Sequence, residues 1–108
     1  MKSETMKIYI SGAISSLPRS EYLKQFADAE RKLVQKGHKV CNPTKLLPSR
    51  HLSVYKVLGY KLTLLYDIYH LMKCDGIYML KGWKDSKGAN VEHSVAKALG
   101  LKIIYNIQ

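Results

Sequence analysis

The chain has 108 residues, of which 46% are hydrophobic and 24% charged, which is typical of one globular domain with no room for a second core. Eighteen Lys and Arg against eight Asp and Glu give a formal net charge of +10, which favours anionic partners such as nucleic acid or a phosphorylated small molecule. No apolar run approaches the roughly 20 residues that span a bilayer, and no signal-peptide core precedes the first strand-like segment. We therefore expect a cytoplasmic protein without membrane contact.

The spacing of apolar residues predicts that strands and helices alternate along the chain. In chain order we expect a strand at 7–11, a helix at 19–35, a strand at 38–41, a helix at 54–73, a strand at 76–80, a helix at 89–99 and a strand at 102–105. Gly37 follows the first helix at the position where helices commonly end. The polar and basic stretch at 44–53 is expected to form an exposed loop.

This alternation also predicts the fold class. Apolar strands separated by helices are typical of a parallel sheet that is covered on both faces. We expect a single domain over residues 1–108, a small flavodoxin-like or Rossmann-like α/β three-layer sandwich with four to five strands. In that architecture ligands bind beyond the C-terminal strand ends, where the strand order reverses. The segments 12–19 and 81–88 leave such ends and are candidate parts of a binding site.

The expected helix at 54–73 is more apolar than a single core-facing stripe requires. In so small a chain a second covered face indicates another subunit, so we predict a homodimer through this helix. Asp67 interrupts its apolar stretch. A carboxylate on a mostly buried helix must be hydrogen-bonded, paired or functional.

The segment 82–92 is the most informative stretch of the sequence. It is a small, Gly-containing turn between a strand and a helix, where α/β proteins place phosphate groups on outward-pointing backbone N–H groups. Glu92 follows in the expected helix, where a carboxylate either offsets the partial positive charge of the N-terminus or acts as a nucleophile. Trp83 could stack on a base or close over the sheet edge, and the sequence does not separate the two.

The segment 11–16 is a second small-residue turn that precedes a helix. Its backbone N–H groups, the hydroxyls of Ser15 and Ser16 and the Arg19 side chain could form an anion cradle. It lacks the ending of a Walker loop and the spacing of a dinucleotide fingerprint. The simpler interpretation is that Ser15 or Ser16 caps the helix, with Pro18 at its start.

Other reactive residue types have plainer interpretations. Asp75 lies where Asp favours a turn, and Asp85 is expected to be a solvated loop carboxylate. His70 and His93 lack a ligand partner, so we predict no metal. The two cysteines, Cys41 and Cys74, have no metal-type spacing and adjoin apolar segments, which indicates buried thiols.

Several motifs together resemble a known superfamily. Over about residues 7–105 the chain resembles the nucleoside 2-deoxyribosyltransferase-like superfamily. More narrowly, it resembles a small branch of that superfamily called domain of unknown function 4406. The chain is also similar to 2′-deoxynucleoside 5′-phosphate N-hydrolases. The resemblance is carried by Lys7-Ile8-Tyr9-Ile10-Ser11-Gly12-Ala13-Ile14, by Asp67 with Cys74-Asp75, by Gly82-Trp83, by Ser86-x-Gly88-Ala89-x-x-Glu92 and by Ala98-Leu99-Gly100.

The resemblance implies a role for each matching residue. Glu92 would be the nucleophile at C1′ of a deoxynucleoside, Asp67 the acid/base or orienting group, and Tyr9 a neighbour of the active carboxylate. The residues implied in substrate or 5′-phosphate binding are Gly12, Ile14, Ser15, Arg19, Ser86, Gly88 and Ala89. Ser15 stands where the hydrolases carry an arginine, and Arg19 is its candidate substitute.

The resemblance therefore implies cleavage or transfer at the N-glycosidic bond of a 2′-deoxynucleoside or its 5′-monophosphate, without a cofactor. The first alternative is a nucleotide-binding or sensing module that keeps the fold without turnover. A nucleic-acid-binding accessory protein is the least favoured alternative, because the lysines are dispersed and no aromatic-basic motif accompanies them.

Overall fold

A computed structural model describes residues 5–14, 17–46 and 52–106, without the side chains of 52–58 and 60. In it, four strands form one parallel sheet. The strands are β1 (Lys7–Ser11), β2 (Lys39–Cys41), β3 (Gly76–Met79) and β4 (Lys102–Tyr105), in the order β2-β1-β3-β4. Every neighbouring pair is parallel. Because β1 lies between β2 and β3, the order reverses beside β1, and a ligand site is expected at its C-terminal end.

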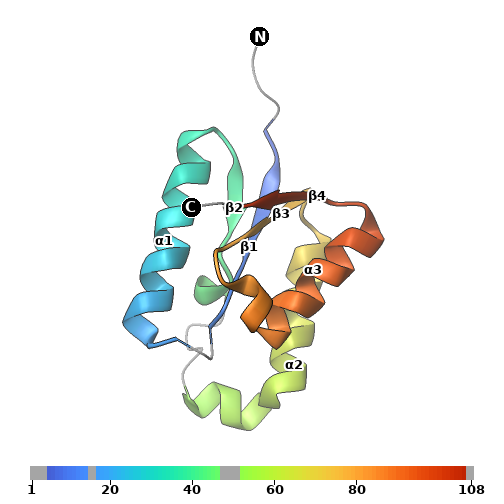
Figure 1. The fold of residues 1–108 in the computed structure, drawn as a ribbon. Coiled ribbons are helices and arrows are strands. Elements are labelled where there is room, and N and C mark those ends of the chain that lie inside the picture. The colour runs from blue at the N-terminus through green and yellow to red at the C-terminus, as the bar shows by residue number, and fades with distance from the viewer. Residues whose placement is uncertain (1–4, 15–16, 47–51, 107–108) are drawn as a thin grey trace.

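Helices cover both faces of the sheet (Figure 1). Helix α1 (Arg19–Gln35) packs on one face through Tyr22, Phe26, Ala29 and Leu33. Helices α2 (Leu52–Met72) and α3 (Lys87–Leu99) cover the other face. Two short 3-10 helices, η1 (Pro43–Lys45) and η2 (Trp83–Asp85), follow β2 and β3. The predicted three-layer α/β fold is confirmed, with a parallel sheet of four strands where four to five were expected.

Side chains along β1 divide between the two faces because a strand alternates them. Ile8 and Ile10 lie in the apolar core beneath α1, whereas Tyr9 lies in the core beneath α2 and α3. All three side chains are fully buried. A single strand therefore supplies both an apolar core and the floor of a polar site.

The observed boundaries differ from the predicted ones at a few places. Helix α3 begins at Lys87, two residues before the expected start, because the Ser86 side chain caps it. Helix α2 extends from Leu52 to Met72 but is interrupted at Gly59, whose φ of 79° and ψ of 163° are not helical. Strand β2 begins one residue later and β3 ends one residue earlier than predicted.

One face of α2 is apolar and exposed. Leu62, Leu65, Tyr69 and Met72, which we call the α2 stripe, are each more than half exposed. They recur at intervals of three and four residues and so share one side of the helix. No helix within the described parts of the chain is long and apolar enough to cross a membrane.

Candidate active site

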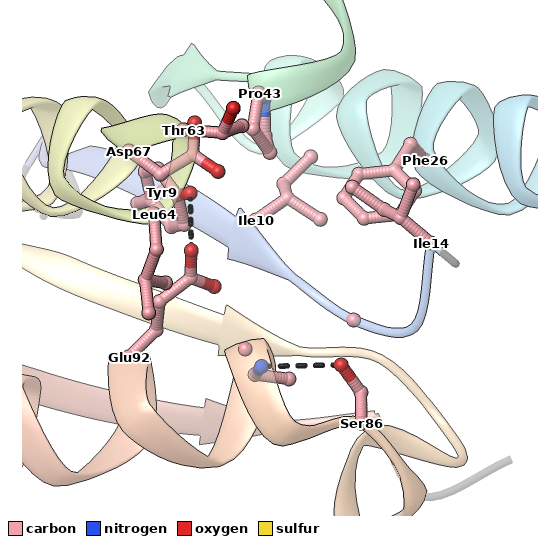
Figure 2. Close-up of a pocket in the computed structure, with 13 residues that line it drawn as sticks. Tyr9, Ile10, Ile14, Phe26, Pro43, Thr63, Leu64, Asp67, Ser86 and Glu92 are labelled. Carbon is pink, nitrogen blue, oxygen red and sulfur yellow. Dashed lines mark hydrogen bonds between the residues drawn. The ribbon is translucent and has the colours of Figure 1, made fainter. Parts of the chain in front are cut away.

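A pocket opens at the C-terminal end of β1, between that strand, α2 and the start of α3 (Figure 2). Eight of the predicted site residues line it: Tyr9, Gly12, Ile14, Asp67, Ser86, Gly88, Ala89 and Glu92. The pocket thus forms beside the strand at which the sheet order reverses, as the fold class predicts. Segments more than 80 positions apart in the sequence meet there.

The Glu92 carboxylate accepts hydrogen bonds from two hydroxyl groups of β1. The Tyr9 hydroxyl donates to Oε2 at 2.8 Å, and the Ser11 hydroxyl donates to Oε1 at 2.6 Å. Tyr9 and Ser11 are two residues apart, so their side chains leave the same face of the strand. The Glu92 side chain is only 6% exposed. Both carboxylate oxygens are therefore fixed in position by short hydrogen bonds.

Ser11 is a site residue that the sequence analysis did not single out. It ends β1, is 1% exposed and donates the shorter of the two hydrogen bonds to Glu92. The signal that could have found it is the strand alternation itself, because Ser11 is the next residue on the face that Tyr9 occupies. Gly12 follows, and a Cβ there would lie 2.8 Å from Leu80 Cδ1. A glycine therefore lets the turn pass closely over the end of β3.

The start of α3 forms the lower end of the pocket. Ser86 is the N-cap, and its hydroxyl accepts a hydrogen bond from the Ala89 backbone N–H at 3.2 Å. The Asn90 side chain donates to the carbonyls of Lys84 and Ser86 at 2.9 and 2.8 Å, which fixes the preceding turn. The helix itself supplies no partner for its first N–H groups, so those of Lys87 and Gly88 suit an anion.

Asp67 and Thr63, both on α2, line the end of the pocket opposite the start of α3. They lie one helical turn apart and are 5% and 4% exposed. The Thr63 hydroxyl donates to the Gly59 carbonyl at 3.0 Å, across the interruption of the helix. Thr63 was not predicted, because the helical pattern alone does not say which face meets the pocket.

Pro43 completes this end of the pocket and is also a residue that the sequence analysis missed. Asn42 holds it in place: its side-chain oxygen accepts from the Thr44 backbone N–H at 3.0 Å, and its amide donates to Glu30 of α1 at 3.0 Å. Lys45 forms an ion pair with Glu30 at 3.0 Å. Burial alone would raise the pKa of Glu30, but these hydrogen bonds outweigh it and hold the pKa below its ordinary 4.5.

The first-loop candidates are only partly placed. Ser15 and Ser16 lie outside the described residues. Arg19 begins α1, is exposed and does not line the pocket. Pro18 is the N-cap of α1 and makes no side-chain cap hydrogen bond, and the predicted serine cap at 15 or 16 falls on residues outside the described ones.

Most of the remaining candidates have structural roles. The Asp75 side chain accepts the Lys7 backbone N–H at 2.9 Å. Trp83 stacks on His93 with ring centroids 4.4 Å apart, near Tyr105 of β4, and so lies at the sheet edge rather than in the pocket. The described residues contain no group of three metal-ligating side chains.

Both cysteines are free and buried, as predicted. A hydrogen bond to the Cys41 thiol, together with burial, raises the pKa of Cys74. Because its pKa is raised, the Cys74 thiol is a poor nucleophile.

A family model described as domain of unknown function (DUF4406) matches residues 6–105. This range includes all four strands and the three α-helices. No curated protein matches the chain.

Proposed function

The chain belongs to the DUF4406 family, and we propose that its pocket cleaves or transfers at the N-glycosidic bond of a 2′-deoxynucleoside or its 5′-monophosphate. The observation that carries the proposal is Glu92, a buried carboxylate whose two oxygens are held by Tyr9 and Ser11 in a pocket that also contains a helix start. The resemblance to the nucleoside 2-deoxyribosyltransferase-like superfamily supports the same chemistry and forms part of the proposal.

In the proposed reaction a carboxylate oxygen of Glu92 attacks C1′ of the sugar. A C1′–O bond forms as the C1′–N bond breaks, and the bonding electron pair leaves with the base, which takes a proton. Water or a second base then attacks C1′ and releases Glu92, as in retaining glycosidases. Tyr9 and Ser11 position the carboxylate, and Asp67 is the acid/base or orienting group across the pocket.

We place the 5′-phosphate at the start of α3. Ser86, Gly88 and Ala89 line this end, and Gly12 and Ile14 lie across from them. The Ser86 hydroxyl accepts from Ala89 and retains its own hydrogen for a phosphate oxygen. Ser15 of the first loop and Arg19 at the start of α1 remain proposed contributors. The net charge of +10 suits a nucleotide better than an uncharged nucleoside.

The alternative function is a nucleotide-binding or sensing module. One observation favours it: both oxygens of Glu92 already accept hydrogen bonds, which also satisfies a carboxylate with a purely structural role. Such a module would bind a nucleotide and release no base.

The α2 stripe supports the proposal that two copies of the chain associate. A row of large apolar side chains at helical spacing, each more than half exposed, is typical of a helix that packs on a partner. Light scattering of the purified protein should show a dimer. Leu65→Lys should shift it to a monomer, with Lys61→Ala as a control at an exposed position of the same helix; an unchanged mass for Leu65→Lys would contradict the proposal.

Base release tests the function directly. The purified protein is incubated with a panel of deoxynucleosides and deoxynucleoside monophosphates, beside Glu92→Ala and the control Glu21→Ala at an exposed glutamate of α1. We expect release by the wild type and the control, and a loss of roughly a thousandfold or more in Glu92→Ala. Nucleotide binding without release by the folded wild type would instead support the binding module.

A further inference from the structure

A second cavity, of about 250 Å³, lies between α1 and the sheet. We propose that this cavity, which we call the α1 cavity, binds a small organic anion through the Tyr78 hydroxyl and the ammonium groups of Lys32 and Lys81. It shares no lining residue with the candidate active site. Binding there is therefore independent of the proposed reaction.

The walls of the α1 cavity come from one helix and two strand ends. Asp28 and Lys32 lie four residues apart and so share one side of α1. Tyr78 belongs to β3, and Lys81 and Asn106 lie just beyond the C-terminal ends of β3 and β4. The volume of about 250 Å³ is a little below the roughly 300–1,000 Å³ of pockets for drug-sized ligands, which suits a small molecule.

The Tyr78 hydroxyl is the feature of this cavity that points to a ligand. Its side chain is 9% exposed, and burial raises its pKa, so the hydroxyl keeps its hydrogen at neutral pH. Among the described residues it has no hydrogen-bond partner, and burial is the one cause of its pKa shift. A buried polar group of this kind normally has a partner, either protein or ordered water.

This hydroxyl is open to the cavity. In the part of the chain that the structure describes, every fully buried side-chain oxygen has a hydrogen-bond partner. The Tyr78 oxygen has none there, so it is not fully buried and keeps contact with solvent. Because Tyr78 lines the α1 cavity, the cavity is where that contact occurs. A ligand in the cavity therefore meets a phenol that donates a hydrogen bond.

The charged groups around the cavity favour an anion. Lys32 and Lys81 are exposed, and neither forms an ion pair with a described carboxylate. Asp28 also lines the cavity, but its carboxylate is occupied by Arg31 and Lys24, whose hydrogen bonds lower its pKa. Two ammonium groups and a phenol all donate, and a carboxylate or phosphate group accepts such bonds strongly.

A chain with a net charge of +10 attracts anions weakly over much of its surface. The α1 cavity differs from that general attraction because a buried donor adds to the two charges. Removing the Tyr78 hydroxyl leaves the net charge unchanged, so the two explanations predict different results for Tyr78→Phe.

Residue-resolved NMR titration of the whole chain tests the site, with inorganic phosphate and acetate as probes. We expect the backbone N–H signals of Lys32 and Lys81 to shift and to saturate with at least one probe. Saturation by phosphate alone indicates a phosphorylated ligand, and saturation by acetate alone a carboxylate. A phosphate response at Gly88 reports the start of α3 instead and is fitted separately.

Three variants decide whether the cavity is the cause. Tyr78→Phe and Lys81→Ala should each weaken binding by about 10- to 100-fold, the usual effect of losing a hydrogen bond to a charged group. Lys97→Ala, at an exposed lysine of α3, is the matched control and should bind as the wild type does. The spectrum of each variant without probe shows whether its fold is retained.

The site would be overturned if neither probe gave saturable shifts at Lys32 and Lys81. Wild-type affinity in Tyr78→Phe or in Lys81→Ala would overturn it too, as would an equal loss in Lys97→Ala. Base release depends on the other pocket, so none of these results would affect the proposed function, and a failure of base release would leave the α1 cavity standing.

Discussion

The two faces of the sheet use β1 in different ways. Beneath α1, Ile8 and Ile10 join aromatic and aliphatic side chains in a core without charged groups. On the opposite face, Tyr9 and Ser11 leave the same strand and hold the buried Glu92 carboxylate. The difference shows how alternation along one strand serves two purposes: Ile8 and Ile10 contribute to the core beneath α1, whereas Tyr9 and Ser11 hold Glu92 on the face that also contains the second apolar core.

The polar face remains compatible with folding because its groups are satisfied. Within the described residues, no buried side-chain nitrogen or oxygen atom lacks a hydrogen-bond partner. An unpaired buried polar group would cost about 1–3 kcal/mol. The hydrogen bonds of Glu92, Ser11 and Thr63 therefore build the site and also avoid the free-energy cost of unpaired buried groups.

The largest expected effect lies on the apolar face. Leu33 of α1 is 3% exposed and packs in the core beneath that helix, so Leu33→Ala should lower the free energy of unfolding by about 2–5 kcal/mol. Base release per folded molecule should not change. Urea unfolding and an activity assay at low temperature measure the two quantities, and a loss of turnover without a loss of stability would contradict the separation of the faces.

A smaller effect is expected from Ser11 on the polar face, and it should fall on the reaction rate rather than on stability. Ser11→Ala removes one hydrogen bond to a charged acceptor, a contribution of about 1.5–3 kcal/mol. If this loss falls on the transition state, kcat decreases by roughly 10- to 100-fold with little change in KM. Ser94→Ala, at an exposed serine of α3, is the matched control. Equal kcat values for Ser11→Ala and wild type would show that Ser11 does not position Glu92.

The smallest effect concerns the link from α1 to η1 and depends on pH. The pKa of Glu30 lies below its ordinary value of 4.5, because hydrogen bonds from Asn42 and Lys45 outweigh the effect of burial. The folded state therefore binds this proton less readily than the unfolded chain. The resulting stability is present above about pH 4.5 and is lost as the pH falls through the lowered pKa.

Glu30→Gln removes this contribution, which we expect to be below about 1 kcal/mol for a partly exposed ion pair. Thermal unfolding of wild type and Glu30→Gln between pH 6 and pH 3 measures it. The wild-type advantage at pH 6 should shrink toward pH 3. A difference that stays constant over this range would contradict the assigned cause.

The sequence predicted most of the fold because strand and helix periods are local. The strand at 7–11 and the helix at 19–35 have the predicted bounds, since an apolar pattern and a clear stop mark each of them. The start of α3 was predicted too late because the cap formed by Ser86 lies before the apolar pattern. The interruption at Gly59 also left no sign in the spacing of apolar residues.

The site was predictable only where motifs or alternation identify a residue. Glu92 and Asp67 are candidates from their positions in the sequence, the resemblance adds Tyr9, and the structure places all three around one pocket. Pro43 and Thr63 could not be predicted, because their positions depend on contacts with Glu30 and Gly59 that only the folded chain makes. Side chains brought together by the tertiary structure leave no pattern in the sequence.

The central claim is that Glu92 attacks the sugar, and trapping the intermediate tests it most directly. Wild type and Glu92→Gln are mixed with the nucleotide that releases its base fastest, quenched in acid and analysed by intact mass and peptide mapping. We predict that the wild type carries one 2-deoxyribose 5-phosphate group, as an ester on Glu92, and that Glu92→Gln carries none. An adduct on another residue, or base release by Glu92→Gln at the wild-type rate, would contradict the account.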